Sequence, residues 1–143
     1  MRILITLAVL VAALMAYIRF APTDTATWHQ MPDTAAPGDT TEAGSFLAVR
    51  RITAPSDQVL AAAEQRALAT PRTTLVAGNV QEGMITFQTR SLFWGFPDHT
   101  TVGVKDDHLV IYGRLRFGRS DLGVNKARIE SWLETLGPLT EPL

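Results

Sequence analysis

Three arginines near the end of one predicted strand are the first residues whose type and spacing suggest chemistry. Arg114 and Arg116 alternate along "YGRLRFGRSDLGVNKARIESWL", and Arg119 follows in a joint that leads into a helix. Guanidinium groups beside the free N–H groups of a helix start can bind an anion. One interpretation of this region is therefore an anion clamp.

The joint also has a structural interpretation, which we favour. Ser120 or Asp121 can accept hydrogen bonds from free N–H groups of a turn, and Asn125 can cap the following helix. Glycine permits backbone conformations that a side chain forbids. The residues assigned this structural role are Asp98, Gly118, Ser120, Asp121, Gly123 and Asn125.

A polar and basic surface is predicted on one face of the sheet. Period-two alternation sends a partly aromatic set of side chains outward, and it places His99 opposite Arg114. Trp94 would lie at the rim of this surface. We expect it to bind an anionic or amphipathic ligand, with an anionic lipid as one candidate. The candidate binding residues are Arg90, Trp94, His99, Tyr112, Arg114, Arg116 and Arg119.

Catalysis is the less favoured interpretation. Asp98 and His99 are the pair that general-base catalysis needs, and a weak hydrolase would add Ser120 as its nucleophile. The sequence has no G-x-S-x-G motif, no metal-ligand spacing, no phosphate-binding glycine motif and no cysteine. With a net charge of −1, the chain is not expected to bind nucleic acid. No metal and no cofactor are expected.

Apolar periodicity predicts an α+β domain with the order β-α-β-β-β-β-α. Two helices would cover one face of an antiparallel sheet. A turn at residues 106–107 sets the register, so that Val104 faces Leu109 and Val102 faces Ile111 on the buried face. Strands are expected over 46–52, 73–80, 84–90, 100–104 and 108–116, and helices over about 56–69 and 125–136.

The N-terminus resembles a membrane span. Sixteen uncharged, mostly apolar residues, 3–18, lie between Arg2 and Arg19. As a helix they would extend about 24 Å, slightly less than a hydrocarbon core of about 30 Å. We interpret residues 1–20 as an uncleaved anchor, with a cleaved signal peptide or a buried helix as alternatives. Arg2 and the terminal amine favour a single span in the inner membrane with the domain in the periplasm.

The remaining segments connect this anchor to the domain. Residues 21–44 are rich in Pro, Thr, Ala, Gly and acids, which predicts a flexible acidic tether before a globular domain over 45–138 and a tail over 139–143. Trp28 is expected at the membrane interface or packed on the domain. The apolar loop 91–97 is expected to fold over the core edge or to contact bilayer, lipid or an apolar ligand. The alternative function is a structural or assembly factor that contacts an envelope protein through Phe93 and Trp94.

Two stretches resemble a known family. "FPDHTTVGV" followed by "YGRLRFGRSDLGVNKARIESWL" is similar to the bacterial and plastid proteins of domain-of-unknown-function family 1499. The resemblance covers roughly residues 45–137, and its most specific part is 118–125. Gly113 and Leu115 stand where the family pattern has serines. The resemblance implies a single-domain protein, often with an N-terminal hydrophobic segment, and it implies no activity.

Overall fold

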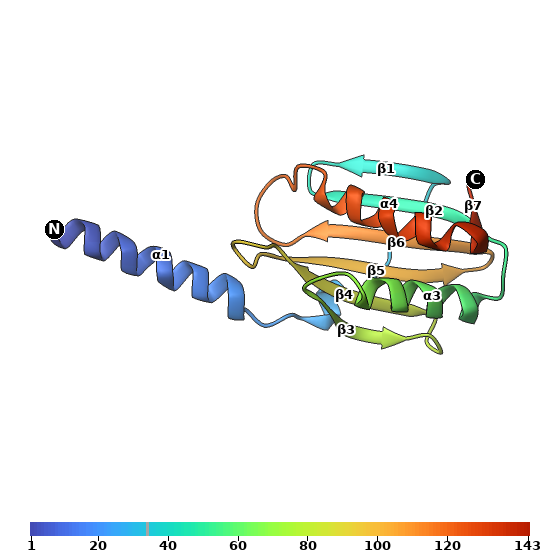
Figure 1. Ribbon diagram of the computed structural model, residues 1–143, viewed down its shortest axis with the longest axis horizontal. Helices are drawn as coiled ribbons and strands as arrows, with labels where there is room; N and C mark the ends of the chain where they lie inside the picture. The colour runs from blue at the N-terminus through green and yellow to red at the C-terminus, as the bar shows by residue number, and fades with distance from the viewer. Residues whose placement is uncertain (34) are drawn as a thin grey trace.

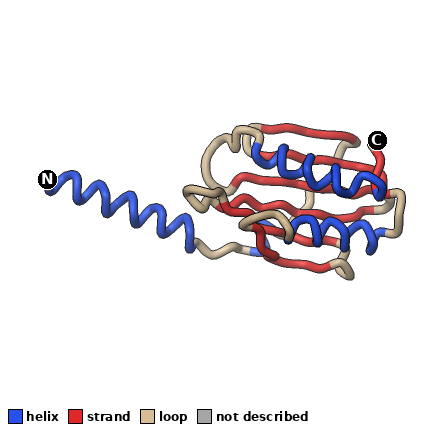
Figure 2. The backbone as a smooth tube through the Cα atoms, viewed as in Figure 1, coloured by secondary structure: helices blue, strands red, loops and turns tan. Residues whose placement is uncertain are grey.

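Seven strands form one antiparallel sheet, and two helices cover one of its faces (Figures 1 and 2). The computed structural model describes residues 1–33 and 35–143. The strands are β1 (Gly38–Glu42), β2 (Ser45–Ile52), β3 (Thr73–Asn79), β4 (Met84–Arg90), β5 (Pro97–Lys105), β6 (His108–Leu115) and β7 (Thr140–Glu141). The helices are α1 (Arg2–Phe20), α2 (Thr25–Trp28), α3 (Ser56–Leu68) and α4 (Val124–Leu136), with a 3₁₀ turn η1 (Gly137–Leu139). The α+β class predicted from the sequence is confirmed.

The strands lie in the order β1-β2-β6-β5-β4-β3, and β7 pairs with the end of β2. The register predicted for the hairpin of β5 and β6 is confirmed, because Val102 pairs with Ile111 and His99 pairs with Arg114. The pairing places apolar side chains on the face that α3 and α4 cover. The buried core residues on this side are Phe46, Ala48, Val59, Leu60, Ala63, Ala67, Ile85, Phe87, Val102, Leu109, Ile111, Ile129, Trp132 and Leu136.

The segment expected as a tether is instead folded onto the domain. Residues 38–42 form the edge strand β1, which pairs with β2. Residues 22–33, here called the strap, cross the sheet face opposite α3 and α4, where Trp28 and His29 contact side chains of β4 and β5. Residue 34, within the expected tether, lies outside the described residues. Residues 140–141 of the expected tail form β7. Neither segment has the sequence periodicity by which strands and helices are predicted.

Two glycines of the sheet leave room for the strap. A Cβ on Gly78 of β3 would lie 2.7 Å from Cε1 of His29, and one on Gly103 of β5 would lie 2.9 Å from Cε of Met31. Both distances are shorter than a van der Waals contact. The strap therefore approaches the strand backbones at positions where the sequence has no side chain.

Helix α1 projects away from one end of the domain (Figure 1). Among the described residues, it is the one helix long and apolar enough to cross a membrane, with a mean hydropathy of 2.4 over its most apolar window. By length and composition it fits either a membrane anchor or a signal sequence. The loops joining β4 to β5 and β6 to α4 lie at the same end of the sheet as α1, and the C-terminus lies at the opposite end (Figure 1).

Candidate functional site

The predicted basic face is covered by the strap and forms a second buried layer. The ring of Trp28 stacks on His99 with 4.2 Å between centroids. A chain of hydrogen bonds runs beneath it: Nδ1 of His29 is 2.8 Å from Oγ1 of Thr86, which is 2.9 Å from Oγ1 of Thr101. The expectation of an exposed outer face is therefore wrong over its centre, because residues 22–33 replace solvent there.

His99 is fully buried in this layer. Burial, and then the positive charges of Arg116, Arg114 and Arg90, lower the pKa of His99 to about 3. Its ring is therefore neutral at physiological pH, and neither ring nitrogen has a hydrogen-bond partner among the described residues. The imidazole is stacked under Trp28 and is inaccessible to a ligand.

Arg114 is also part of the buried layer. Its Nη2 donates to the carbonyl oxygen of Trp28 at 2.6 Å and to Oγ1 of Thr101 at 2.7 Å. Its guanidinium lies 4.8 Å from the ring centroid of Tyr112 and 5.3 Å from that of Trp28. Burial lowers the pKa of Arg114. These contacts make Arg114 a residue that holds the strap on the sheet.

The other two arginines of the predicted clamp have different surroundings. Arg116 donates from Nη2 to the carbonyl oxygen of Pro22 at 2.8 Å, and its guanidinium lies 5.2 Å from the ring centroid of Phe117. Arg119 is exposed in the loop before α4. The structure therefore does not join Arg114, Arg116 and Arg119 in one clamp.

The joint between β6 and α4 is held by Asp121. Its carboxylate accepts hydrogen bonds from the backbone N–H groups of Gly123 at 3.0 Å and Asn125 at 2.9 Å. Burial alone would raise the pKa of Asp121, but these hydrogen bonds outweigh it and lower the pKa. Ser120 accepts from the N–H of Leu122 at 3.2 Å. Asp121, rather than Asn125, thus supplies the acceptor at the start of α4.

Asn125 and Asp98 meet on the helix-covered side of the sheet. Nδ2 of Asn125 lies 3.4 Å from Oδ2 of Asp98, and Nη2 of Arg128 lies 3.6 Å from the same oxygen. Burial raises the pKa of Asp98 to about 6, although the charge of Arg128 opposes this rise. Asp98 and His99 are neighbours in β5 and so point to opposite faces. The general-base pair is therefore not formed.

The hydrolase interpretation also fails at its nucleophile. Ser120 lies in the exposed loop before α4, where its hydroxyl is used by the turn. His99 is buried beneath Trp28 on the other side of the sheet from Asp98. The three side chains thus have separate surroundings and separate structural roles. In the described part of the chain, no group of three or more His, Asp or Glu side chains gathers as a metal site.

An accessible basic site lies at the end of the sheet next to α1. A hollow of about 470 Å³ is lined by Arg19 of α1, Arg72 before β3 and Arg90 of β4. We call it the arginine hollow. None of these three guanidinium groups lies within ion-pair distance of a carboxylate in the described residues. Hydroxyl groups complete the lining, from Thr70, Thr73, Thr74 and Ser91.

Backbone contacts position these arginines. Arg90 donates from Nη1 to the carbonyl oxygen of Gly95 at 2.9 Å, and Nε of Arg72 donates to the carbonyl oxygen of Arg90 at 3.0 Å. Arg72 has φ +59, a left-handed conformation uncommon for a residue with a side chain. Burial, followed by the charges of Arg19 and Arg116, lowers the pKa of Arg90. Of the arginines that line the hollow, Arg19 is the one whose charge contributes to this lowering, after burial.

A neighbouring hollow of about 460 Å³ extends the basic site. It shares Arg72 and Arg90 with the first hollow and adds Arg66 and Arg128. Sequence reasoning identified only Arg90 of this site. Arg19 was interpreted as a flank of the anchor, and Arg72 lies in a short loop after Pro71 that carries no periodic signal. The hollow is assembled from segments that are distant in the sequence.

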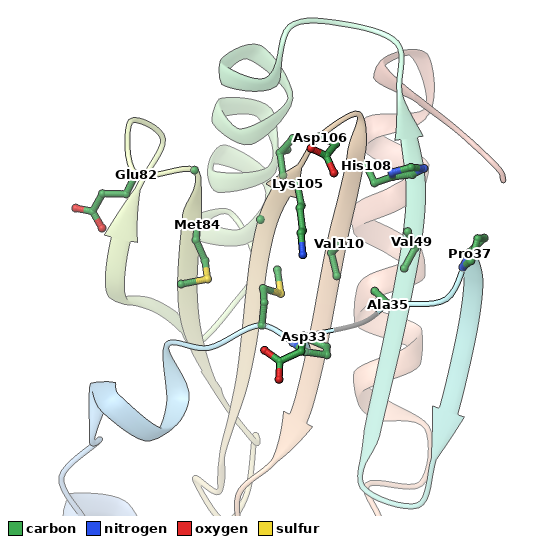
Figure 3. Close-up of a pocket in the computed structure, with 15 residues that line it drawn as sticks. Asp33, Ala35, Pro37, Val49, Glu82, Met84, Lys105, Asp106, His108 and Val110 are labelled. Carbon is green, nitrogen blue, oxygen red and sulfur yellow. The ribbon is translucent and has the colours of Figure 1, made fainter.

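A third hollow, of about 640 Å³, lies between the strap and the far end of the sheet (Figure 3). Its lining is largely apolar and includes Met84, Val49 and Val110. The side chain of Lys105 extends over the sheet toward Val110, whereas Glu82 points away (Figure 3). With acidic and basic residues both at its edge, this hollow has no single charge preference.

The fold and site define an α+β domain in which a strap continues an apolar helix across the sheet. The chain belongs to the family described as protein of unknown function (DUF1499), which matches residues 22–136. The match begins at the start of the strap, so the strap is part of the family domain. A comparison with curated proteins found no match.

Proposed function

We propose that this chain is a non-enzymatic, membrane-anchored domain that binds the anionic group of an amphipathic ligand in the arginine hollow. The observation that supports this most directly is the set of three guanidinium groups, Arg19, Arg72 and Arg90, which have no carboxylate partner among the residues that the structure describes. Gathering like charges is unfavourable unless an anion offsets the repulsion. Phosphate and carboxylate groups match guanidinium geometry and accept hydrogen bonds from it.

The composition of the hollow supports the same ligand class. The hydroxyl groups of Thr74 and Ser91 can donate further hydrogen bonds to an oxyanion, whereas those of Thr70 and Thr73 are already bonded to Arg66 and Thr89. Leu68 and Leu92 supply apolar lining for the rest of an amphipathic molecule. This proposal keeps Arg90 from the predicted basic face and moves the site to the sheet end beside α1.

We place the hollow close to the outer surface of the inner membrane. Arg19, one of its lining residues, lies in the last turn of α1. Arg2 and the terminal amine favour retention of the N-terminus in the cytoplasm, which puts the domain in the periplasm. An anionic lipid headgroup would then reach the hollow directly. The periplasmic side and the uncleaved anchor are parts of the proposal.

Binding can be measured on the full chain in nanodiscs of neutral lipid. Calorimetry would titrate inorganic phosphate in one arm and a monomeric short-chain phosphatidic acid in the other. Each lost charge-assisted hydrogen bond should weaken binding by about tenfold or more. We therefore expect this loss for Arg19→Gln and for Arg90→Gln. Arg51→Gln is the matched control, because Arg51 is ion-paired with Glu141 at 3.6 Å at the far end of β2.

The two arms separate a free ion from an amphiphile. Binding of phosphatidic acid much tighter than binding of phosphate supports an amphipathic ligand, and equal affinities would reduce the proposal to a simple oxyanion site. Absence of binding in both arms would refute the proposal. Equal affinities for the wild type, Arg19→Gln and Arg90→Gln would refute it as well.

A further inference from the structure

Four large apolar side chains are exposed at the end of the domain that carries α1. Leu92 is 64 % exposed, Phe93 86 % and Trp94 59 %, all in the loop between β4 and β5. Leu122, in the loop between β6 and α4, is 93 % exposed. We call these four residues the apolar rim. Exposed apolar side chains gathered on neighbouring loops are typical of a surface that contacts a partner or a membrane.

The backbone at Leu122 makes this exposure unusual. Its φ is +53, in the left-handed region where glycine or asparagine is favoured over a residue with a larger side chain. Yet the side chain packs against little of the folded domain. Neither backbone conformation nor packing explains leucine at this position, whereas contact with an apolar environment does.

The last turns of α1 contact both loops of the apolar rim. Nη1 of Arg19 lies 3.1 Å from the position that a Cβ on Gly95 would occupy, next to Trp94. The ring of Tyr17 meets Phe117 edge-on with 6.5 Å between centroids, at the start of the second loop. Figure 1 shows both loops at the end of the sheet from which α1 departs. The apolar rim is therefore level with the end of the apolar helix.

We propose that the apolar rim docks into the interfacial layer of the bilayer that α1 spans. Tryptophan favours this layer because its ring is apolar and its N–H is polar. Arg19, in the last turn of α1, and Arg116, which donates to the carbonyl oxygen of Pro22 just after α1, would meet anionic headgroups there. The docking goes beyond the arginine hollow, because the rim contacts lipid whether or not the hollow holds a ligand.

Docking would also give the domain a defined orientation. The strap and the sheet follow α1 directly, so immersion of two loops fixes the sheet end against the membrane. The opposite end, with the β3–β4 and β5–β6 turns, would then face away from the bilayer (Figure 1). The two ends of the sheet provide a matched comparison for a depth measurement.

Quenching of tryptophan by brominated lipids tests this proposal on the full chain in vesicles. Trp132 is 1 % exposed and Trp28 is packed on His99, so Trp94 is the tryptophan placed to meet lipid. The emission of Trp94 is the difference in fluorescence between the wild type and Trp94→Phe. We expect brominated phosphatidylcholine to quench about half or more of that emission. In the control, Gln81→Trp is added to Trp94→Phe, which moves the indole to the exposed β3–β4 turn at the far end. We expect no quenching of that indole.

Phe93→Ser combined with Leu122→Ser keeps Trp94 but removes two members of the rim. Both side chains are exposed, so the domain should stay folded, and quenching of Trp94 should fall at least twofold. An unquenched Trp94 in the wild type, or equal quenching of the indole at position 81, would overturn the docking. A Trp94 that responds only to an added envelope protein would favour a protein partner and would overturn it too. Quenching that is equal in neutral and anionic vesicles would leave docking supported, and binding at the arginine hollow is decided by its own titration.

Discussion

Replacing His99 with phenylalanine tests whether the strap closes over the sheet in solution. Phenylalanine keeps an aromatic ring against Trp28 and removes two nitrogens that have no hydrogen-bond partner among the described residues. Unpaired buried polar groups cost about 1–3 kcal/mol, and the larger ring costs a similar amount in packing. At pH 7.5 we therefore expect the free energy of unfolding to change by less than about 1 kcal/mol.

The larger effect is on the pH dependence of stability. Burial and three neighbouring arginines lower the pKa of His99 from 6.5 to about 3. A lowered histidine pKa contributes stability that is complete above pH 6.5 and is lost as the pH falls toward 3, because the unfolded chain takes up the proton first. At 1.36 kcal/mol per pH unit, the wild type loses about 2 kcal/mol from this group between pH 6.5 and pH 5. His99→Phe should not lose it.

Urea unfolding of the full chain in detergent micelles, followed by near-ultraviolet circular dichroism, measures this difference at pH 7.5 and pH 5. Because the pKa of Asp98 is raised to about 6, this residue increases the free energy of unfolding as the pH falls. The increase is the same in the wild type and in His99→Phe, so it cancels in the comparison. His99→Gln is a control that removes the charge change and also the aromatic stack, so it should lower stability at both pH values. If the wild type and His99→Phe lose the same stability on acidification, the strap does not keep His99 neutral. The outer face would then be open.

Three further substitutions, two of them with a matched control, probe the elements that position the site, each by its effect on the free energy of unfolding. Gly78→Ala should cost about 3 kcal/mol or more, because φ is +81 and the new Cβ would lie 2.0 Å from a β4 carbonyl oxygen. Gly83→Ala, at φ +76 in open space, should cost only about 1 kcal/mol. Asp121→Ala should cost about 1 kcal/mol through loss of the acceptor at α4, and Ser120→Ala should cost less than half of that. Trp28→Ala should cost about 3 kcal/mol and speed amide hydrogen exchange over residues 22–33, and unchanged exchange would contradict the assigned role of the strap.

The sheet could be predicted from the sequence because its signals are local. Alternation places Val102 and Val104 on one face, and a two-residue turn at 106–107 then sets their partners on β6. The same alternation correctly puts His99 opposite Arg114. Whether that second face meets solvent depends on another segment of the chain, which alternation cannot report. The pattern of polar residues therefore predicted which side chains share this face, but not that the strap covers them.

The strap and the arginine hollow could not be predicted because their signals are long-range. The sequence of the strap has no helical or strand periodicity. Its position depends on two glycines of the sheet, Gly78 in β3 and Gly103 in β5. The hollow combines a helix end at Arg19 with a loop at Arg72 and a strand end at Arg90. Each arginine has an ordinary explanation in its own segment. Only the fold shows that they line one site, whose described lining includes no carboxylate.

The covalent path from α1 to the sheet explains why the accessible chemistry gathers at one end. The strap follows the apolar helix after one residue, Ala21, and is pinned by Trp28 and Arg114, so the helix cannot move far from the sheet. A flexible tether would have allowed the domain to present any surface to the membrane. A pinned strap allows mainly one surface, which holds the arginine hollow and the apolar rim. Loss of that pinning should therefore weaken the contact of Trp94 with lipid, even though no residue of the rim is changed. The test is Arg114→Met, in which we expect brominated lipid to quench Trp94 less than it does in the wild type.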